Sequence, residues 1–266
     1  MRKTGWTGLV ALILLVPACG AALPGASDVA AGRPATGAWA RVLARHQHRG
    51  GLDYGALKAD PADLETYLDS LAGARPEEWS EAEQKAFWGN AYNAVVVHFV
   101  LERYPGIASV KKVEGFFTTL RFPVAGEELT LDEIEKRARD LGDPRVHFAV
   151  VCASTSCPDL RHEPYRGEEV DRQLEEDARR FLDSPEKGLR YDEETNTLYL
   201  SAIFKWYAGD FTGGSTLVAY FARGKVVNWL LPHLPEHLAA TLEDRDPTVR
   251  YLDYDWNLND RPRASM

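Results

Sequence analysis

The chain has 266 residues, of which 45% are hydrophobic and 27% charged, a balance typical of a folded protein that can bury a sizeable core. Its formal net charge is −9 and no basic block stands out, which argues against nucleic acid as a partner. Aromatic residues make up 11%, including seven Trp, and predict a well-filled core.

The first residues predict export. Two basic residues precede a short apolar run, residues 9–16, which is too short to span a bilayer and suits the hydrophobic region of a secretory signal. The Val-Pro-Ala-Cys segment that ends at Cys19 resembles the lipobox of bacterial lipoproteins. We therefore expect a signal peptide over residues 1–19, lipidation of Cys19 and attachment to a membrane of the cell envelope. The alternative is ordinary signal cleavage a few residues later, which also predicts an exported protein.

Residues 20–37 are rich in Ala, Gly and Pro and are interpreted as a tether. We see no further boundary, so residues 38–266 are expected to form a single globular domain. Amphipathic spacing predicts two helices near its start, over residues 39–48 and 57–71.

A third helix, over residues 80–104, is the most distinctive one. Ser80 and Glu83 have the spacing of a capping box, which fixes the start of the helix. Between Lys85 and Glu102 the helix contains no Asp, Glu, Lys or Arg. A helix that is apolar nearly all round is expected to be buried.

The polar residues of this helix are candidates for a site. Asn90 and Asn93 are three residues apart, so they share a face and are expected to reach a common neighbour. Buried amides need hydrogen-bond partners, and backbone groups of an adjacent loop would supply them. His98 is either a candidate base or a histidine satisfied within the core.

The stretch from Val146 to Arg161 is taken as the centre of the protein. Its β-branched run, residues 146–151, predicts a strand that contains His147 and ends in a small polar loop. The loop holds Cys152 and Cys157, and reactive groups often lie on loops of a rigid scaffold. In a regular strand, His147 and Cys152 would face opposite sides, which argues against a direct pair.

The remaining elements alternate helices with short strands. Thr130 and Glu133 also have the spacing of a capping box and predict a helix from Thr130 to about Asp140. We then expect a charged surface helix over 168–182, a hairpin over 188–200, an aromatic helix over 201–211, amphipathic helices over 216–230 and around Leu238, and a final strand over 249–258. Trp206, Tyr207 and Phe211 are expected in the core. The resulting fold is a single α+β domain, helix-rich, with a small mixed or antiparallel sheet around strand 146–151 and the buried helix 80–104 beneath it.

Several motifs carry a resemblance to a known family. They are Ala-Phe-Trp-Gly-Asn-Ala-Tyr-Asn-Ala (86–94), Asp-Pro-Arg-Val-His-Phe-Ala (143–149), Cys-Ala-Ser-Thr-Ser-Cys-Pro-Asp-Leu-Arg (152–161), Leu-Ser-Ala-Ile-Phe-Lys-Trp-Tyr-Ala-Gly-Asp-Phe (200–211) and Tyr-Asp-Trp-Asn-Leu-Asn (254–259). Together they resemble the domain-of-unknown-function 547 family, with a core of about residues 80–259. Family members often have Asn before the first loop cysteine and Gly after it, where this chain has Val151 and Ala153. The family has no assigned activity, so the resemblance implies no specific function.

The leading hypothesis is a cysteine-dependent hydrolase or acyltransferase. A thiolate nucleophile needs a base and a group that orients the base. The candidate catalytic residues are Cys152, Cys157, His147 and His98. The candidate orienting and binding residues are Asn90, Asn93, Ser154, Ser156, Arg161 and Asp255. A distant similarity to papain-like or transglutaminase-like thiol folds implies the same chemistry.

Other interpretations stay open. A Cys152–Cys157 disulfide would suit an exported protein and would rigidify a non-catalytic binding or scaffolding domain of the envelope. The pair could instead serve a redox role, although its Cys-x4-Cys spacing differs from that of thioredoxin-like sites. Zinc bound by His98, His147, Cys152 and Cys157 is a third alternative, with spacing that matches no standard zinc motif. We predict no cofactor, and the expected partner is an unknown envelope protein or a small substrate.

Overall fold

The computed structural model describes residues 32–213 and 223–261. The predicted signal peptide, Cys19 and most of the predicted tether lie outside the described residues. The chain is helix-rich, with about 50% helix and small antiparallel and mixed sheets, and this confirms the prediction of a single α+β domain. Among the described residues, no helix has the length and apolar character that crossing a membrane requires.

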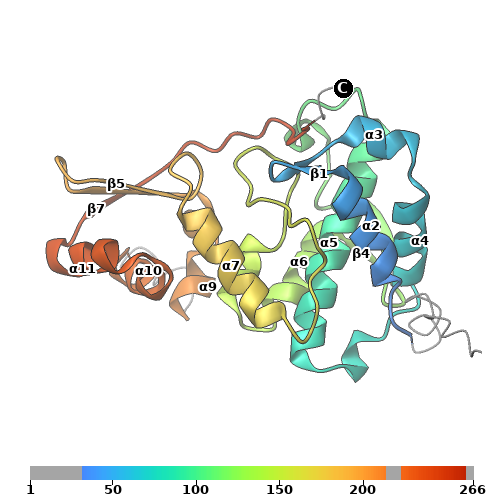
Figure 1. The fold of residues 1–266 in the computed structure, drawn as a ribbon, viewed down its shortest axis with the longest axis horizontal. Helices are drawn as coiled ribbons and strands as arrows, with labels where there is room; N and C mark the ends of the chain where they lie inside the picture. The colour runs from blue at the N-terminus through green and yellow to red at the C-terminus, as the bar shows by residue number, and fades with distance from the viewer. Residues whose placement is uncertain (1–31, 214–222, 262–266) are drawn as a thin grey trace, which may run out of the picture.

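Helix α5 (Glu81–Arg103) is the centre of the larger hydrophobic core, as the sequence predicts. Its start is fixed by the predicted capping box: the Ser80 hydroxyl accepts the Glu83 backbone N–H, and the Glu83 carboxylate accepts the Ser80 N–H. Helices α4 (Ala62–Leu71), α6 (Leu131–Arg139) and α7 (Val170–Leu182) contact it. Because α5 is covered on several sides, its uncharged middle is buried (Figure 1).

The N-terminal helices differ from their predicted bounds. The first helix, α2, spans Thr36–His46, so it begins inside the predicted tether. The predicted helix 57–71 is two helices, α3 (Tyr54–Ala59) and α4, separated at Asp60 and Pro61. Proline disfavours the helical conformation in the residue before it, and Asp60 has φ −139° and ψ 74°.

The predicted strand 146–151 is wrong. Residues Pro144–Phe148 form the 3-10 helix η3, started by Pro144 and by Asp143, whose side chain accepts the Arg145 N–H. The β-branched run therefore turns instead of extending. The polar backbone groups that follow bind an α5 side chain, described below, so the segment needs no neighbouring strand.

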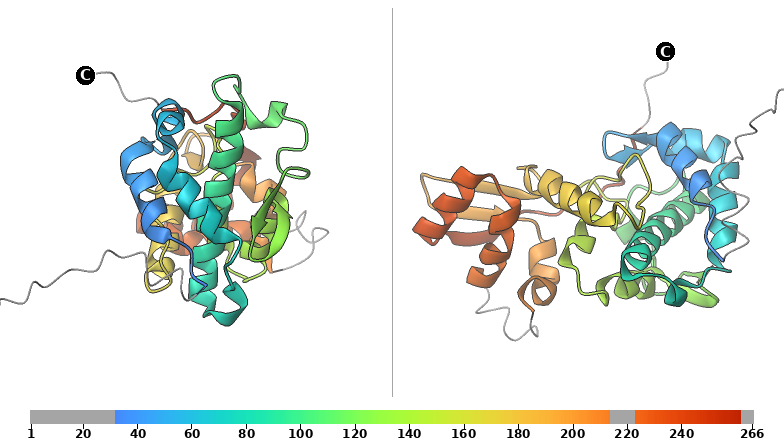
Figure 2. Two further views of the ribbon diagram at one scale, coloured as in Figure 1. Left: turned by 90° about the vertical axis from the view of Figure 1, so that its right-hand side faces the viewer. Right: turned by 60° about the horizontal axis from the view of Figure 1, so that its bottom comes forward.

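The second half of the chain forms a separate group of elements around a three-stranded sheet. Strand β6 (Thr197–Leu200) pairs antiparallel with β5 (Leu189–Asp192), as the predicted hairpin requires, and parallel with β7 (Thr248–Tyr251). Helices α10 (Arg223–Leu230) and α11 (Glu236–Arg245) lie near this sheet (Figures 1 and 2). The first part of the predicted helix 216–230 lies outside the described residues.

Two predictions about the second half need correction. The aromatic segment 201–211 is two short helices, α8 (Ile203–Trp206) and α9 (Ala208–Thr212). The predicted strand 249–258 is regular only within β7. After β7 the chain runs back, extended, to the first half of the molecule, where Asn259 N–H donates to Ala153 and Leu258 N–H donates to Ala108 (Figure 1).

The remaining elements are short. They are β1 (Gln47–His48), β2 (Gly51–Leu52), η1 (Pro76–Glu78), η2 (Val110–Lys112), β3 (Arg121–Val124), β4 (Glu127–Thr130) and η4 (Leu231–His233). Strands β1 and β2 pair antiparallel, as do β3 and β4. Strand β4 leads into α6 through the predicted capping box of Thr130 and Glu133. This places α6 against α5 and fixes which of its faces turns inward.

Candidate active site

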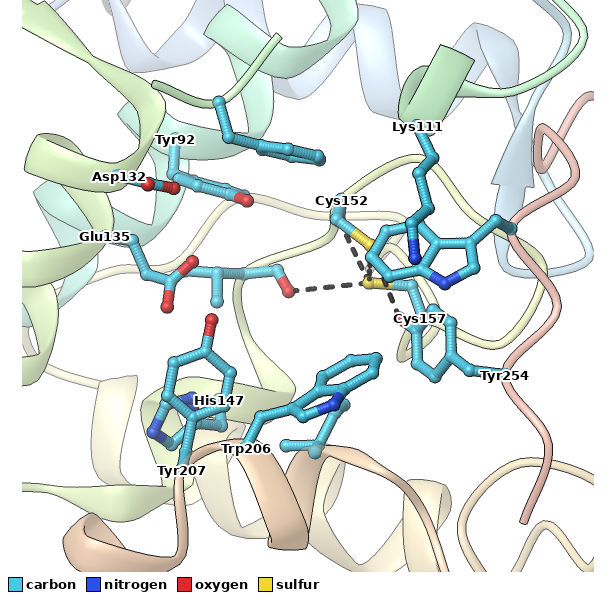
Figure 3. A pocket seen from close by; sticks show the side chains of 14 residues that line it. Tyr92, Lys111, Asp132, Glu135, His147, Cys152, Cys157, Trp206, Tyr207 and Tyr254 are labelled. Atoms are coloured by element: carbon cyan, nitrogen blue, oxygen red, sulfur yellow. Dashed lines mark hydrogen bonds between the residues drawn. The ribbon is translucent and has the colours of Figure 1, made fainter. Parts of the chain in front are cut away.

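A cavity of about 330 Å³ opens beside the cysteine loop. Its lining comes from α5, α6, the 146–157 segment, the α8 region and the returning C-terminal tail (Figure 3). Most of its apolar lining residues belong to one or the other of the two large hydrophobic clusters or pack against them. The cavity therefore lies where the two groups of elements meet.

The two cysteines form one side of the cavity. Their Sγ atoms are 2.9 Å apart, and both are free thiols. The Cys152 backbone N–H also donates to the Cys157 sulfur at 2.9 Å. Cys157 is buried, whereas Cys152 is half-buried. The two cysteines predicted to lie in one loop are thus in contact. Hydrogen bonds involving the Cys157 sulfur join the two ends of that loop.

Hydrogen bonds around Cys152 favour its ionised form. Besides Cys157, the hydroxyls of Ser154 and Tyr254 lie 3.1 and 3.4 Å from its sulfur. Hydrogen bonding from Cys157 is the largest effect on Cys152, and the donors together outweigh burial and lower the pKa of this thiol from 9.0 to about 7. Burial and the neighbouring Cys152 raise the pKa of Cys157 well above its usual value. Cys157 therefore keeps its proton and donates a hydrogen bond to the Cys152 thiolate.

The C-terminal tail brings Tyr254 to the loop. Asp255 N–H donates to the Ser156 hydroxyl at 2.9 Å, and Ser156 N–H donates to the Asp255 carbonyl. Thr155 N–H and hydroxyl both donate to the Asn257 carbonyl. Ser156 and Asp255, both predicted as binding residues, therefore hold the tail against the loop.

The two asparagines of α5 bind backbone, as the sequence suggests, but not a common neighbour. Asn93 donates to the Ala149 carbonyl at 2.9 Å and accepts the Val151 N–H at 2.8 Å. Asn90 makes the same pair of bonds to the N–H and carbonyl of Tyr165. Asn93 thus positions the residues just before Cys152, whereas Asn90 anchors a different segment.

Neither predicted histidine contacts a sulfur. His147 lines the cavity, but its Nε2 atom is 2.8 Å from Asp210 Oδ2, which Arg139 also binds at 2.7 Å. Its ring packs on that of Tyr207, with centroids 4.2 Å apart. His98 lies elsewhere on α5, against Phe122. Burial lowers the pKa of His98.

Arg161 lies away from the cavity, and the predicted zinc set is not brought together. Arg161 is buried among acidic residues, 2.7 Å from Glu163 and 2.8 Å from Asp177, and it lines no part of the cavity. Within residues 32–213 and 223–261, no group of three or more His, Cys, Asp or Glu side chains could hold a metal ion. His98 is too far from the cysteine loop to join such a set, because it packs elsewhere on α5.

Glu135 is a cavity residue that the sequence predictions missed. It is only 9% exposed, and it lies on the inward face of α6 with Leu131 and Ala138. Burial is the largest effect on this carboxyl and raises its pKa, although a hydrogen bond from Tyr207 acts in the opposite direction. The signal was available in the sequence, since Glu135 follows Leu131 by four residues on an otherwise apolar stripe.

An aromatic cluster forms the outer rim, and it was also missed. Trp206 is 46% exposed, so its predicted place in the core is wrong. It stacks on Trp256 with centroids 5.8 Å apart, and Tyr254 packs against both rings. Lys111 Nζ lies 4.8 Å from the Trp256 centroid. Tyr254 and Trp256 reach the rim from about a hundred residues beyond the loop, which spacing in the sequence does not show.

Comparison with known proteins finds a family model that matches part of the chain. Residues 76–182 match the family model described as "Protein of unknown function, DUF547". No curated protein and no solved structure matches the chain. The matched segment contains both cysteines, His147, Asn93 and Glu135, but it ends before Tyr207 and Tyr254. The match supports assignment of this segment to the DUF547 family.

Proposed function

We propose that the protein is a thiol-dependent hydrolase or acyltransferase in which Cys152 is the nucleophile. The observation that carries this proposal is a sulfur within hydrogen-bonding distance of the Cys157 thiol and of the Ser154 and Tyr254 hydroxyls, at the wall of a cavity. The thiolate is the reactive form of cysteine, and an exposed route to it is needed for chemistry. The cavity supplies that route.

The arrangement replaces the base that such enzymes usually place beside the thiol. In a Cys–His pair the imidazole removes the thiol proton. Here the donors stabilise the thiolate directly, with the pKa of Cys152 at about 7, so a substantial fraction is ionised at neutral pH. The Cys152 thiolate would attack a carbonyl carbon, form a thioester and release the leaving group.

The cavity limits the substrate. Small-molecule sites usually have volumes of about 300–1,000 Å³, and this cavity, at about 330 Å³, is at the low end. Its aromatic rim, with Trp206 and Trp256, offers flat apolar surface next to the sulfur. A small acyl compound, or one acyl group at the end of a larger molecule, fits these dimensions.

The test uses p-nitrophenyl acetate as an activated ester on reduced protein. We expect a burst of p-nitrophenol and a mass gain of one acetyl group on Cys152 in the wild type. Cys152→Ala should lose both signals, whereas Cys157→Ala should retain acylation at a reduced rate. Equal burst and labelling in wild type and Cys152→Ala would contradict the proposal.

A second candidate is a non-catalytic envelope binding or scaffolding domain closed by a Cys152–Cys157 disulfide. The separation of 2.9 Å favours it, because a disulfide requires about 2.05 Å and the sulfurs already touch. Intact mass before and after reduction separates the two candidates. Protein isolated from its native compartment would gain two hydrogens on reduction if the bond is present.

We also propose that the protein is exported and anchored to a bacterial membrane through a lipid on Cys19. The support is the predicted signal segment and its Cys-terminated motif. Growth with an alkyne-labelled fatty acid should label the wild type and not Cys19→Ala. Label on neither protein, with both recovered in the soluble envelope fraction, would favour ordinary signal cleavage.

A further inference from the structure

We infer that Glu135 is the acid–base residue of this site: it gives a proton to the leaving group after Cys152 attacks and takes one from water in the second half of the reaction. This inference rests on the proposed function, since it assigns a partner to the Cys152 nucleophile. It gives a role to a buried carboxyl that neither the family match nor the sequence motifs single out.

The position of Glu135 is the first argument. The side chain lines the same cavity as Cys152 and lies across it, on α6, while the sulfur belongs to the loop (Figure 3). An apolar residue would suit this inward stripe of α6, between Leu131 and Ala138. A buried carboxyl costs stability unless it is paired or protonated, so its place at a cavity calls for a functional explanation.

The surroundings of Glu135 favour its neutral form. On its own helix it faces Asp132 and Arg139, and from neighbouring elements it faces His147, Tyr207 and Tyr92. The two nearby cationic or basic groups, Arg139 and His147, are both bound to Asp210. Their attraction is thus largely directed to another carboxylate, and burial dominates at Glu135, which raises its pKa.

Tyr207 faces the carboxyl. Its hydroxyl points toward Glu135 (Figure 3), and it opposes the rise in the pKa of that group. The Tyr207 ring in turn contacts the guanidinium of Arg139, 4.7 Å from its centroid, and the imidazole of His147, with ring centroids 4.2 Å apart. His147 therefore supports Tyr207, and its Nε2 is engaged by Asp210, which leaves Glu135 as the better placed proton donor.

The proposed steps balance as a hydrolysis. The Cys152 thiolate forms a C–S bond with the acyl carbon, the bond to the leaving oxygen or nitrogen breaks, and Glu135 gives its proton to that atom. Glu135, now a carboxylate, takes a proton from water while the water oxygen bonds to the acyl carbon. The C–S bond breaks, the sulfur leaves as thiolate, and Glu135 is again protonated.

The test compares two esters on the reduced full-length protein. p-Nitrophenyl acetate has a leaving group that needs no proton, whereas the leaving group of phenyl acetate is as basic as a tyrosine side chain. Glu135→Gln keeps the size and the contact with Tyr207 but has no proton to give. The matched control is Glu128→Gln, an exposed residue on β4 outside the cavity.

Glu135→Gln should leave the p-nitrophenyl acetate burst within about twofold, yet slow acylation by phenyl acetate about 10²-fold or more. Its acetyl-enzyme should also persist. Glu128→Gln should match the wild type with both esters. If Glu135→Gln and wild type show the same ratio of rates for the two esters, the assignment is wrong. If wild-type Cys152 is not acylated at all, the proposed function itself fails.

A second variant covers the case in which Glu135→Gln does not fold. The Tyr207 hydrogen bond favours the ionised carboxyl, so Tyr207→Phe should raise the pKa of Glu135 further. In a plot of rate against pH, acylation by phenyl acetate should fall as pH rises through that pKa. This falling limb of the profile should move to higher pH in Tyr207→Phe. A limb that stays in place would contradict proton donation by Glu135.

Discussion

The two walls of the cavity treat an acidic group in opposite ways. On the loop side, Cys152 is surrounded by donors, and hydrogen bonding lowers its pKa in spite of burial. On the α6 side, burial is the largest effect on Glu135 and raises its pKa, although Tyr207, His147 and Arg139 act against it. A carboxyl ordinarily ionises several pH units below a thiol. The two shifts bring the pKa values of Glu135 and Cys152 closer together.

This difference favours the anionic form of the nucleophile on one wall and the protonated form of the carboxyl on the other. Both groups are buried, but hydrogen bonding outweighs burial at Cys152, whereas burial outweighs the neighbouring groups at Glu135. Groups whose pKa values are moved from their usual values toward neutral pH are typical of acid–base sites. The predictions below test the two walls separately.

The largest effect is expected at the sulfur wall. Cys152→Ala should lower alkylation of the reduced protein by iodoacetamide by about 10³-fold or more at pH 7, because Cys157 keeps its proton. Cys157→Ala removes the main donor, so the pKa of Cys152 should move back toward its ordinary value and labelling at pH 7 should fall several-fold. Mass spectrometry of each protein locates the label. Strong labelling of Cys157 in Cys152→Ala would contradict the assigned roles.

Substitution of the two asparagines of α5 should distinguish effects on the stability of the fold from effects on the reactivity of Cys152. Asn93→Ala and Asn90→Ala each leave a buried N–H and carbonyl without partners, and each should destabilise the fold by about 2–4 kcal/mol. Only Asn93→Ala should change the alkylation rate of Cys152, because Asn93 holds the backbone before that residue. Urea unfolding and iodoacetamide rates measure the two effects. Equal loss of reactivity in both variants would mean that the loop is not specifically anchored by Asn93.

The acid wall should appear in the pH dependence of stability. The folded pKa of Glu135 is raised, so the folded state binds more protons than the unfolded state above pH about 4.3, the usual Glu value. Stability contributed by this group is full at lower pH and is lost as pH rises toward the folded pKa. Glu135→Gln should flatten this decline in urea unfolding, and Glu128→Gln should not. A steeper decline in Glu135→Gln would have the wrong sign.

The smallest effect is expected at Ala153. This residue has φ +61°, a left-handed conformation that costs residues with a Cβ about 1–2 kcal/mol. Ala153→Gly should therefore stabilise the protein by about 0.5 kcal/mol, after the larger chain entropy of glycine is subtracted. Ala149→Gly is the control, because Ala149 has φ −93° and should lose stability. Destabilisation by Ala153→Gly would show that its buried methyl outweighs the backbone strain.

Local signals in the sequence predicted much of the fold. The capping boxes at Ser80 and Thr130 and the uncharged middle of α5 lie within short windows, and the structure confirms all three. The strand over 146–151 was wrong because the side chain of Asn93, more than fifty residues away, binds its backbone groups. The composition of a β-branched run does not predict such a long-range hydrogen bond.

The site was predictable only in part, for the same reason. Cys152, Cys157, Ser154 and His147 lie in or beside one motif, and all were singled out. Tyr254 reaches the sulfur through long-range hydrogen bonds between the tail and the loop, which no local pattern records. Glu135 was the avoidable omission, because its apolar stripe is visible in the sequence.

The central claim is that hydrogen bonding holds Cys152 as a thiolate near neutral pH. The most direct measurement is the rate of Cys152 alkylation by iodoacetamide as a function of pH, on reduced wild-type protein. We predict a rate that is half-maximal near pH 7, from the lowered pKa of Cys152. A midpoint at about 8.5 or above, the range of an ordinary thiol, would contradict the account.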